Sequence, residues 1–193
     1  MHHPTRTKVF AIAAAVVAAV QFGTAKVNTR SAFDKKFDFT QAHTWGWNPK
    51  GAGEVVAART RDDDPQAIKR RAEPLIMAAA AVEMPRRGLT AATADPDLTL
   101  TYYLLLTIGD ARQTAGQFLP AVAQWGIPPF APQTTALEYI PTGSLVFDLA
   151  SKGGVVWRGV GEAKIDWDLN EKQREDLIRE AVKKIFERYP PKK

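Results

Sequence analysis

Residues 98–108 carry the clearest structural signal in this sequence, an alternation of apolar and mainly polar side chains. The apolar set recurs at every second position and consists of Leu98, Leu100, Tyr102, Leu104, Leu106 and Ile108. Successive side chains of a β-strand point to opposite faces of a sheet, so this spacing predicts a strand with one face in a hydrophobic core. Such a strand requires partner strands beside it and a second layer over its apolar face.

Partner strands are predicted over residues 143–149 and 155–163, which flank a glycine-containing turn. If the loop of this hairpin comprises residues 152–154, Asp148 lies opposite Arg158 on the neighbouring strand. We prefer this register because it places opposite charges beside each other and leaves apolar residues to pair with apolar residues.

Asp148 and Arg158 are candidate binding residues, since a paired carboxylate and guanidinium also occur in functional sites. The commoner role of opposite charges on hairpin strands is cross-strand stabilisation, by about a few tenths of a kcal/mol. Alternation puts Trp157 on the other face of its strand, the face shared with Phe147. We therefore expect Trp157 in the core and Arg158 on the opposite side of the sheet.

Two helices are predicted from capping signals and from apolar residues at helical spacing. The first covers residues 65–82, begins after an Asp-Pro pair, and contains Pro74, which must kink or split it. The second covers about residues 170–189, where Asn170 and Gln173 match a capping box and a Pro-Pro pair follows the end. Each helix has one apolar stripe that must pack against the sheet.

Three shorter segments, residues 27–33, 37–40 and 43–47, have the composition of extended chain. The simplest architecture that buries all the apolar stripes is an α+β fold, with two principal helices packed on one face of a mainly antiparallel sheet. We expect residues 26–193 to form a single α+β domain with one long loop at about residues 109–135.

The first 25 residues have the layout of a cleavable signal peptide. A positively charged start is followed by twelve apolar residues at positions 9–20, and Gly23 and Ala25 provide the small side chains expected before a cut at Lys26. Twelve helical residues span about 18 Å, too short for a hydrocarbon core of roughly 30 Å. The mature protein is therefore expected to be periplasmic or secreted, with no transmembrane anchor and, because cysteine is absent, no lipidation.

Composition argues against several classes of function. The chain has no cysteine, and His43 is the only histidine after residue 25, so thiolate and multi-histidine metal sites are excluded. Nucleotide-binding glycine motifs are missing as well. Basic and acidic residues are interleaved and the net charge is +5, which does not indicate nucleic acid binding. We predict no catalytic residues, no metal and no cofactor, although an enzymatic activity stays open.

The long loop at residues 109–135 contains unusually many apolar side chains for a connection. Phe118, Trp125, Ile127 and Phe130 are the candidate binding residues within it. One interpretation is a lid that folds back over the sheet, and the other is an exposed patch for a partner or membrane. We favour the lid, because an exposed cluster of aromatic residues would lower solubility.

Several short motifs follow one another along most of the mature chain. They are Asp34, Phe37-Asp38-Phe39 and Thr44-Trp45, then Asp95, Asp97-Leu98 and Tyr102, then Gly143-Ser144-Leu145-Val146-Phe147-Asp148, Val156-Trp157-Arg158-Gly159 and finally Tyr189-Pro190-Pro191. In this order they resemble the bacterial family called domain of unknown function 4136, whose members are exported and often lipoproteins. The resemblance implies an α+β fold and an envelope location, and it implies no catalytic residues.

The leading functional hypothesis is an exported envelope protein that acts as a non-enzymatic binding or envelope-maintenance module. Its partner would be another envelope protein or a small apolar ligand. Two alternatives remain: a small-ligand carrier that uses a groove under the 109–135 loop, and a carboxylate-dependent hydrolase with a site near Asp148.

Overall fold

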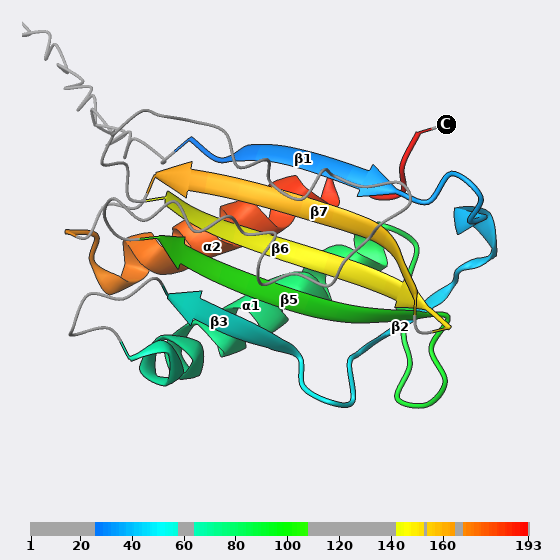
Figure 1. Cartoon of the computed structure of the whole chain (residues 1–193), viewed down its shortest axis with the longest axis horizontal. Helices are drawn as coiled ribbons and strands as arrows, with labels where there is room; N and C mark the ends of the chain where they lie inside the picture. The colour runs from blue at the N-terminus through cyan, green and yellow to red at the C-terminus, as the bar shows by residue number, and fades with distance from the viewer. Residues whose placement is uncertain (1–25, 58–63, 108–141, 153, 165–167, 193) are drawn as a thin grey trace, which may run out of the picture.

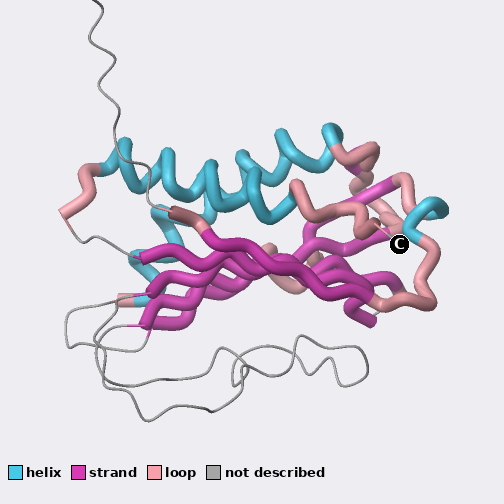
Figure 2. The backbone as a smooth tube through the Cα atoms, turned by 90° about the horizontal axis from the view of Figure 1, so that it is seen from above, coloured by secondary structure: helices cyan, strands magenta, loops and turns pink. Residues whose placement is uncertain are grey.

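The computed structural model describes residues 26–57, 64–107, 142–152, 154–164 and 168–192. In this part of the chain seven strands form one sheet, and two long helices lie side by side on one of its faces (Figures 1 and 2). In chain order the elements are β1 (Asn28–Phe33), the 3-10 helix η1 (Phe39–Gln41), β2 (Thr44–Trp47), β3 (Gly53–Ala57), α1 (Pro65–Arg86), β4 (Thr90–Ala91), β5 (Leu98–Thr107), β6 (Thr142–Ser151), β7 (Gly154–Lys164) and α2 (Glu171–Phe186). The fold is α+β, as expected.

The sheet is mixed, so the prediction of a mainly antiparallel sheet is wrong. Strands β1, β7, β6 and β5 pair antiparallel in that order, whereas β2 and β3 both pair parallel to β5 and β4 pairs parallel to β2. Helix α1 lies between β3 and β5 in the chain, and a connection through a helix allows two strands to pair in the same direction. The sequence-based prediction missed β3, a strand of five residues that begins at Gly53, because glycine is typical of turns and breaks rather than of strands.

Both helices begin where the capping signals place them. The side chain of Asp64 caps α1, and Asn170 and Gln173 form the predicted capping box of α2, with both hydrogen bonds at 2.9 Å. Helix α1 continues past Pro74 without being split. Pro74 lies on the exposed side of the helix, so its ring leaves the core packing undisturbed, but it has no N–H to donate to the carbonyl of Arg70. None of the described helices has the length and apolar character needed to cross a membrane.

The helix side of the sheet is filled by large aromatic side chains. Trp157 is fully buried and stacks on Phe186 of α2, with ring centroids 5.8 Å apart and ring planes 16° from parallel. Gly159 makes this packing possible, since a Cβ there would lie 2.3 Å from the Trp157 ring and 2.5 Å from Ile185. The expected inward position of Trp157 is confirmed.

Strands β6 and β7 pair in the predicted register, with Asp148 opposite Arg158. The turn is tighter than the expected three-residue loop, because the pairing continues to Ser151 and Gly154. A β-bulge after Leu149 accommodates this difference by placing one additional residue on β7.

Residues 37–40 were expected to be extended, but part of this segment forms the helical turn η1. The cause is local: Oδ1 of Asp38 accepts hydrogen bonds from the backbone N–H of Thr40 at 3.1 Å and from its hydroxyl at 2.7 Å. Aspartate side chains that bond to the backbone two residues later favour turns over strands.

Candidate functional site

Asp148 and Arg158 form a deeply buried ion pair. Arg158 donates from Nε to Oδ1 and from Nη2 to Oδ2 of Asp148, both at 2.6 Å, and the two side chains are only 5% and 3% exposed. Phe147 and Leu149 belong to the core on the helix side, so alternation places Asp148 on the opposite face of the sheet. Burial raises the pKa of the Asp148 carboxyl, and the hydrogen bonds and charge of Arg158 act against that rise.

The surroundings of this ion pair are apolar. A small cluster on the same face contains Tyr103, Leu105, Val146 and Val160. Burial, and after it the charge of Asp148, raises the pKa of the Tyr103 hydroxyl to about 12. Because one guanidinium holds both carboxylate oxygens in a buried setting, the arrangement is typical of a structural ion pair rather than of an acid or base that exchanges protons with a substrate.

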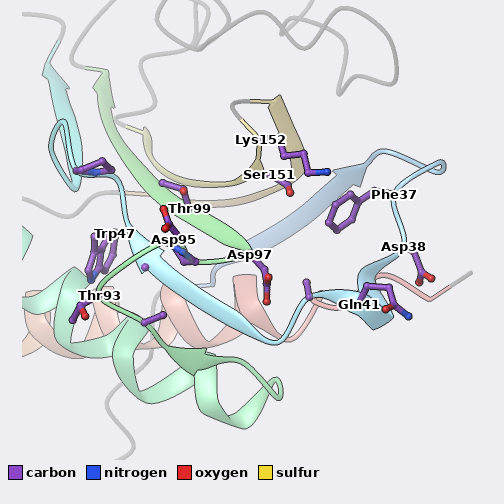
Figure 3. A pocket seen from close by; sticks show the side chains of 15 residues that line it. Phe37, Asp38, Gln41, Trp47, Thr93, Asp95, Asp97, Thr99, Ser151 and Lys152 are labelled. Atoms are coloured by element: carbon purple, nitrogen blue, oxygen red, sulfur yellow. The ribbon is translucent and has the colours of Figure 1, made fainter.

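A second candidate site is an open groove of about 750 Å³ at one end of the sheet, which we call the end groove (Figure 3). It lies where the β1–β2 segment, the β4–β5 loop and the β6–β7 turn meet. The groove is lined by Phe37, Asp38, Gln41, Ala42, Gly46, Trp47, Pro49, Ala92, Thr93, Asp95, Pro96, Asp97, Thr99, Ser151 and Lys152. All of these residues lie in the described part of the chain.

One wall of the end groove depends on Gly46. The β4–β5 loop passes so close to β2 that a Cβ on Gly46 would lie 2.8 Å from the carbonyl oxygen of Ala92 and 3.2 Å from the ring of Pro96. Any larger residue at position 46 would push this loop away from the strand. The wall is therefore built by a close backbone approach between segments about fifty residues apart in the sequence.

Asp97 fastens the same loop to the start of β2. Its Oδ2 accepts hydrogen bonds from the backbone N–H of His43 at 3.0 Å, and from the N–H and hydroxyl of Thr44 at 2.9 and 2.8 Å. The Thr44 hydroxyl oxygen in turn accepts a bond from the Asp97 backbone N–H at 2.9 Å. The three hydrogen bonds to the Asp97 carboxylate, of which that from the His43 N–H has the largest effect, hold the pKa of this group below its ordinary value.

The side chains in the end groove combine aromatic surface with polar groups. Trp47 and Phe37 are each held edge-on by a neighbouring ring, at centroid distances of 5.6 and 4.9 Å. Asp95 and Lys152 have positive φ angles of 44° and 49°, and within the described residues no other non-glycine position does. Neither side chain takes part in a hydrogen bond or ion pair there. Backbone strain of this kind often occurs at functional sites.

The predicted binding residues fall into two groups, of which the structure describes one. Asp148 and Arg158 come together as a buried pair, on the face of the sheet away from the helices. Phe118, Trp125, Ile127 and Phe130 lie outside the described residues, as does the predicted groove under the 109–135 loop. The described part of the chain contains no group of three or more histidine, aspartate or glutamate side chains arranged to hold a metal ion.

The end groove was not predicted from the sequence. Two local signals point toward it in retrospect: the Trp45-Gly46-Trp47 run, with a glycine inside a strand, and the Asp95-Pro96-Asp97 turn. A glycine within a strand often marks a place where another backbone approaches closely. Neither signal identifies the partner segment, because the contact joins regions far apart in the chain.

Comparisons with known proteins place the chain in a family without naming an activity. A comparison with curated proteins finds no match. Among solved structures, a PDZ domain protein from Parabacteroides distasonis ATCC 8503 is 14% identical, with a TM-score of 0.49; the match covers 88% of this chain and 38% of that protein's length. The PelC dodecamer from Paraburkholderia phytofirmans is 11% identical, with a TM-score of 0.36 and coverage of 83% and 94%. The family model described as Domain of unknown function (DUF4136) matches residues 29–191, and this chain therefore belongs to that family.

Proposed function

We propose that this protein is an exported binding module of the bacterial cell envelope, which holds a ligand or partner segment in the end groove and performs no chemistry on it. The observation that carries the proposal is the end groove itself. It is large enough for a ligand, and its walls are fixed by Gly46 and Asp97. It also presents Asp95 and Lys152, whose side chains have no hydrogen-bond or ion-pair partner in the described chain. Pockets of several hundred Å³ with a few convergent polar groups are typical of binding sites.

Export is supported by the first 25 residues, which lie outside the described part of the chain. Their charged start, apolar run and small residues before Lys26 are typical of a signal peptide. Intact-mass measurement on protein from fractionated cells tests this step. We expect a periplasmic protein that begins at or near Lys26. Recovery mainly in the membrane fraction, with the first 25 residues still attached, would contradict it.

The non-enzymatic part of the proposal is supported by the state of the carboxylates. Both carboxylate oxygens of Asp148 accept hydrogen bonds from Arg158. Oδ2 of Asp97 already accepts three hydrogen bonds that hold the groove wall together. An acid–base catalyst needs a carboxyl group that is free to meet its substrate. Neither of these two carboxylates meets that requirement. Asp95 is accessible in the groove, so the test below also asks whether the retained material is chemically changed.

A pair of matched variants tests whether the end groove binds envelope material. Thr93 and Thr90 are both exposed and three residues apart, but only Thr93 lines the groove. The mature protein is immobilised and loaded with enzymatically solubilised cell envelope, and the retained material is analysed by mass spectrometry. We expect Thr93→Trp to lose most of the retention and Thr90→Trp to keep it, with the retained material chemically unchanged after prolonged incubation.

Two results would overturn the proposal. Equal retention by the parent and both variants would show that the groove is not the binding surface. Conversion of the retained material into new products by the parent protein, but not by Thr93→Trp, would show that the groove belongs to an enzyme. Circular dichroism on both variants confirms that the fold is intact before they are compared.

A further inference from the structure

We infer that the ligand of the end groove is a carbohydrate chain, which packs sugar faces on Trp47 and Phe37 and bonds its hydroxyl groups to the polar side chains between them. This inference rests on the proposed function, because it assigns a ligand class to the same groove. Four properties of the groove support it: the fixed aromatic rings, the mixture of polar groups, the balance of charges and the position in the sheet.

The two aromatic rings are partly exposed and held in fixed orientations. Trp47 meets Trp45 edge to face at 75°, and Phe37 meets Phe39 at 74°. Each ring also packs against the main hydrophobic core, and both line the groove, at opposite ends of it in Figure 3. A pyranose ring has a flat face of C–H groups that packs well on such an apolar surface, and a rigid aromatic contact costs little entropy on binding.

The polar groups of the groove include donors, acceptors and groups that do both. Asp95 accepts, Lys152 donates, and Gln41, Thr99 and Ser151 can do either. Each sugar hydroxyl also donates and accepts, so a carbohydrate can satisfy all of these groups. A purely apolar ligand would leave them without partners, which is costly once water is excluded.

The charges of the groove argue against an anionic ligand. Three lining residues carry carboxylates, namely Asp38, Asp95 and Asp97, and Lys152 is the one cation among the lining residues. A phosphate or carboxylate ligand would meet repulsion from these groups unless it stayed next to Lys152. A neutral, hydroxyl-rich ligand meets no such repulsion and still uses both signs of charge through charge-assisted hydrogen bonds.

The position of the groove argues against an extended peptide. A peptide that adds to a sheet needs an open strand edge with a row of unpaired backbone groups. Here β2 is flanked by β5 on one side and by β4 on the other, and the groove is lined by side chains from loops and from the β6–β7 turn. Side-chain hydrogen bonds therefore dominate the groove, which suits a glycan better than a peptide backbone.

The test measures binding of defined glycans to the mature protein by isothermal titration calorimetry. The probes are the N-acetylglucosamine tetramer and maltotetraose, which are both neutral, with tetraalanine as the peptide probe. We expect saturable binding of at least one glycan and none of tetraalanine. The key variant is Asp95→Gly, because glycine adopts the positive φ of 44° without strain and the carboxylate is lost.

Asp95→Gly should weaken glycan binding about tenfold, the usual consequence of losing a hydrogen bond to a charged group, while the melting temperature stays level or rises. Glu54→Gln, which neutralises an exposed carboxylate on β3 outside the groove, is the matched control and should bind like the parent.

The outcomes separate the ligand class from the proposed function. If no glycan binds, or if tetraalanine binds instead, while Thr93→Trp still abolishes retention of envelope material, the carbohydrate assignment is wrong and the binding function stands. If glycans bind equally to the parent, to Asp95→Gly and to Thr93→Trp, the groove is not their site and the inference is overturned. If neither the retention of envelope material nor the binding of glycans changes in the groove variants, the proposed function and the carbohydrate assignment are both wrong.

Discussion

The two faces of the sheet bury neighbouring residues of the same strands by different means. On the helix side, Trp157 and Phe147 pack on the aromatic ring of Phe186, with centroid distances of 5.8 and 4.8 Å. On the other side, the adjacent residues Arg158 and Asp148 are also buried but meet as an ion pair. Neighbouring residues on β6 and β7 are thus buried by aromatic packing on one face of the sheet and by an ion pair on the other.

This difference determines how much stability a substitution on each face costs. Apolar packing loses stability in proportion to the volume removed, because every lost contact and every remaining cavity adds its own cost. A buried ion pair contributes little net free energy while it is intact, since the desolvation of both charges offsets their attraction. Loss of one partner is expensive, whereas replacement of both by apolar residues need not be.

The largest effect is expected from Trp157→Ala. This variant removes a fully buried side chain that contacts α2, so the free energy of unfolding should fall by about 3–5 kcal/mol. Chemical denaturation measures the loss. The control is Val82→Ala, since Val82 is 52% exposed on α1 and should cost less than about 1 kcal/mol. A similar loss in both variants would show that Trp157 is not an essential part of the core.

The ion pair on the opposite face is tested by comparing one single variant with a double variant. Arg158→Met leaves the Asp148 carboxylate buried without its guanidinium, and it should lower stability by about 3 kcal/mol. The double variant Asp148→Leu with Arg158→Met should recover most of that loss, because both charges are then replaced by apolar side chains. If the double variant is no more stable than the single one, the pair itself, rather than the burial of its charges, stabilises this face.

The sequence predicted the elements whose information is local. Alternation over residues 98–108 corresponds to β5, the charge pattern predicted the Asp148–Arg158 register, and the capping box at Asn170 begins α2. The parallel pairing of β2 and β3 with β5 escaped prediction, because it depends on which distant strand each segment meets.

The end groove escaped prediction for the same physical reason. Its wall exists because the carboxylate of Asp97 reaches the backbone of Thr44 and because Gly46 allows the β4–β5 loop to come close. Each residue alone is compatible with an ordinary turn or strand. Of the predicted binding residues, Asp148 and Arg158 could be paired from strand alternation, whereas a groove made by three separate connections leaves no periodic trace in the sequence.

A smaller effect is expected from Gly159→Ala, which adds a single methyl group to the helix side. The new Cβ would lie within 2.5 Å of both Trp157 and Ile185, so these side chains must move. Overpacking of this kind usually costs about 1–3 kcal/mol. Gly154→Ala is the matched control on the same strand, because the nearest atom to its Cβ would be 3.8 Å away. Equal denaturation midpoints for the two variants would show that α2 does not depend on the small residue at position 159.

The smallest effect is expected from titration of Asp97, which also contrasts with the buried carboxylate of Asp148. Hydrogen bonds from His43 and Thr44 lower the pKa of Asp97 in the folded protein, so its charged form stabilises the fold above the ordinary pKa of aspartate. That contribution is lost as the pH falls through the lowered pKa. Asp97→Asn should therefore be less stable than the parent near neutral pH, and the difference should shrink below about pH 4. Denaturant titrations of both proteins across this range measure the effect, and the titration of Asp148 cancels because both proteins contain it. A stability difference that stays constant with pH would mean that the bonds to Asp97 depend on its shape and not on its charge.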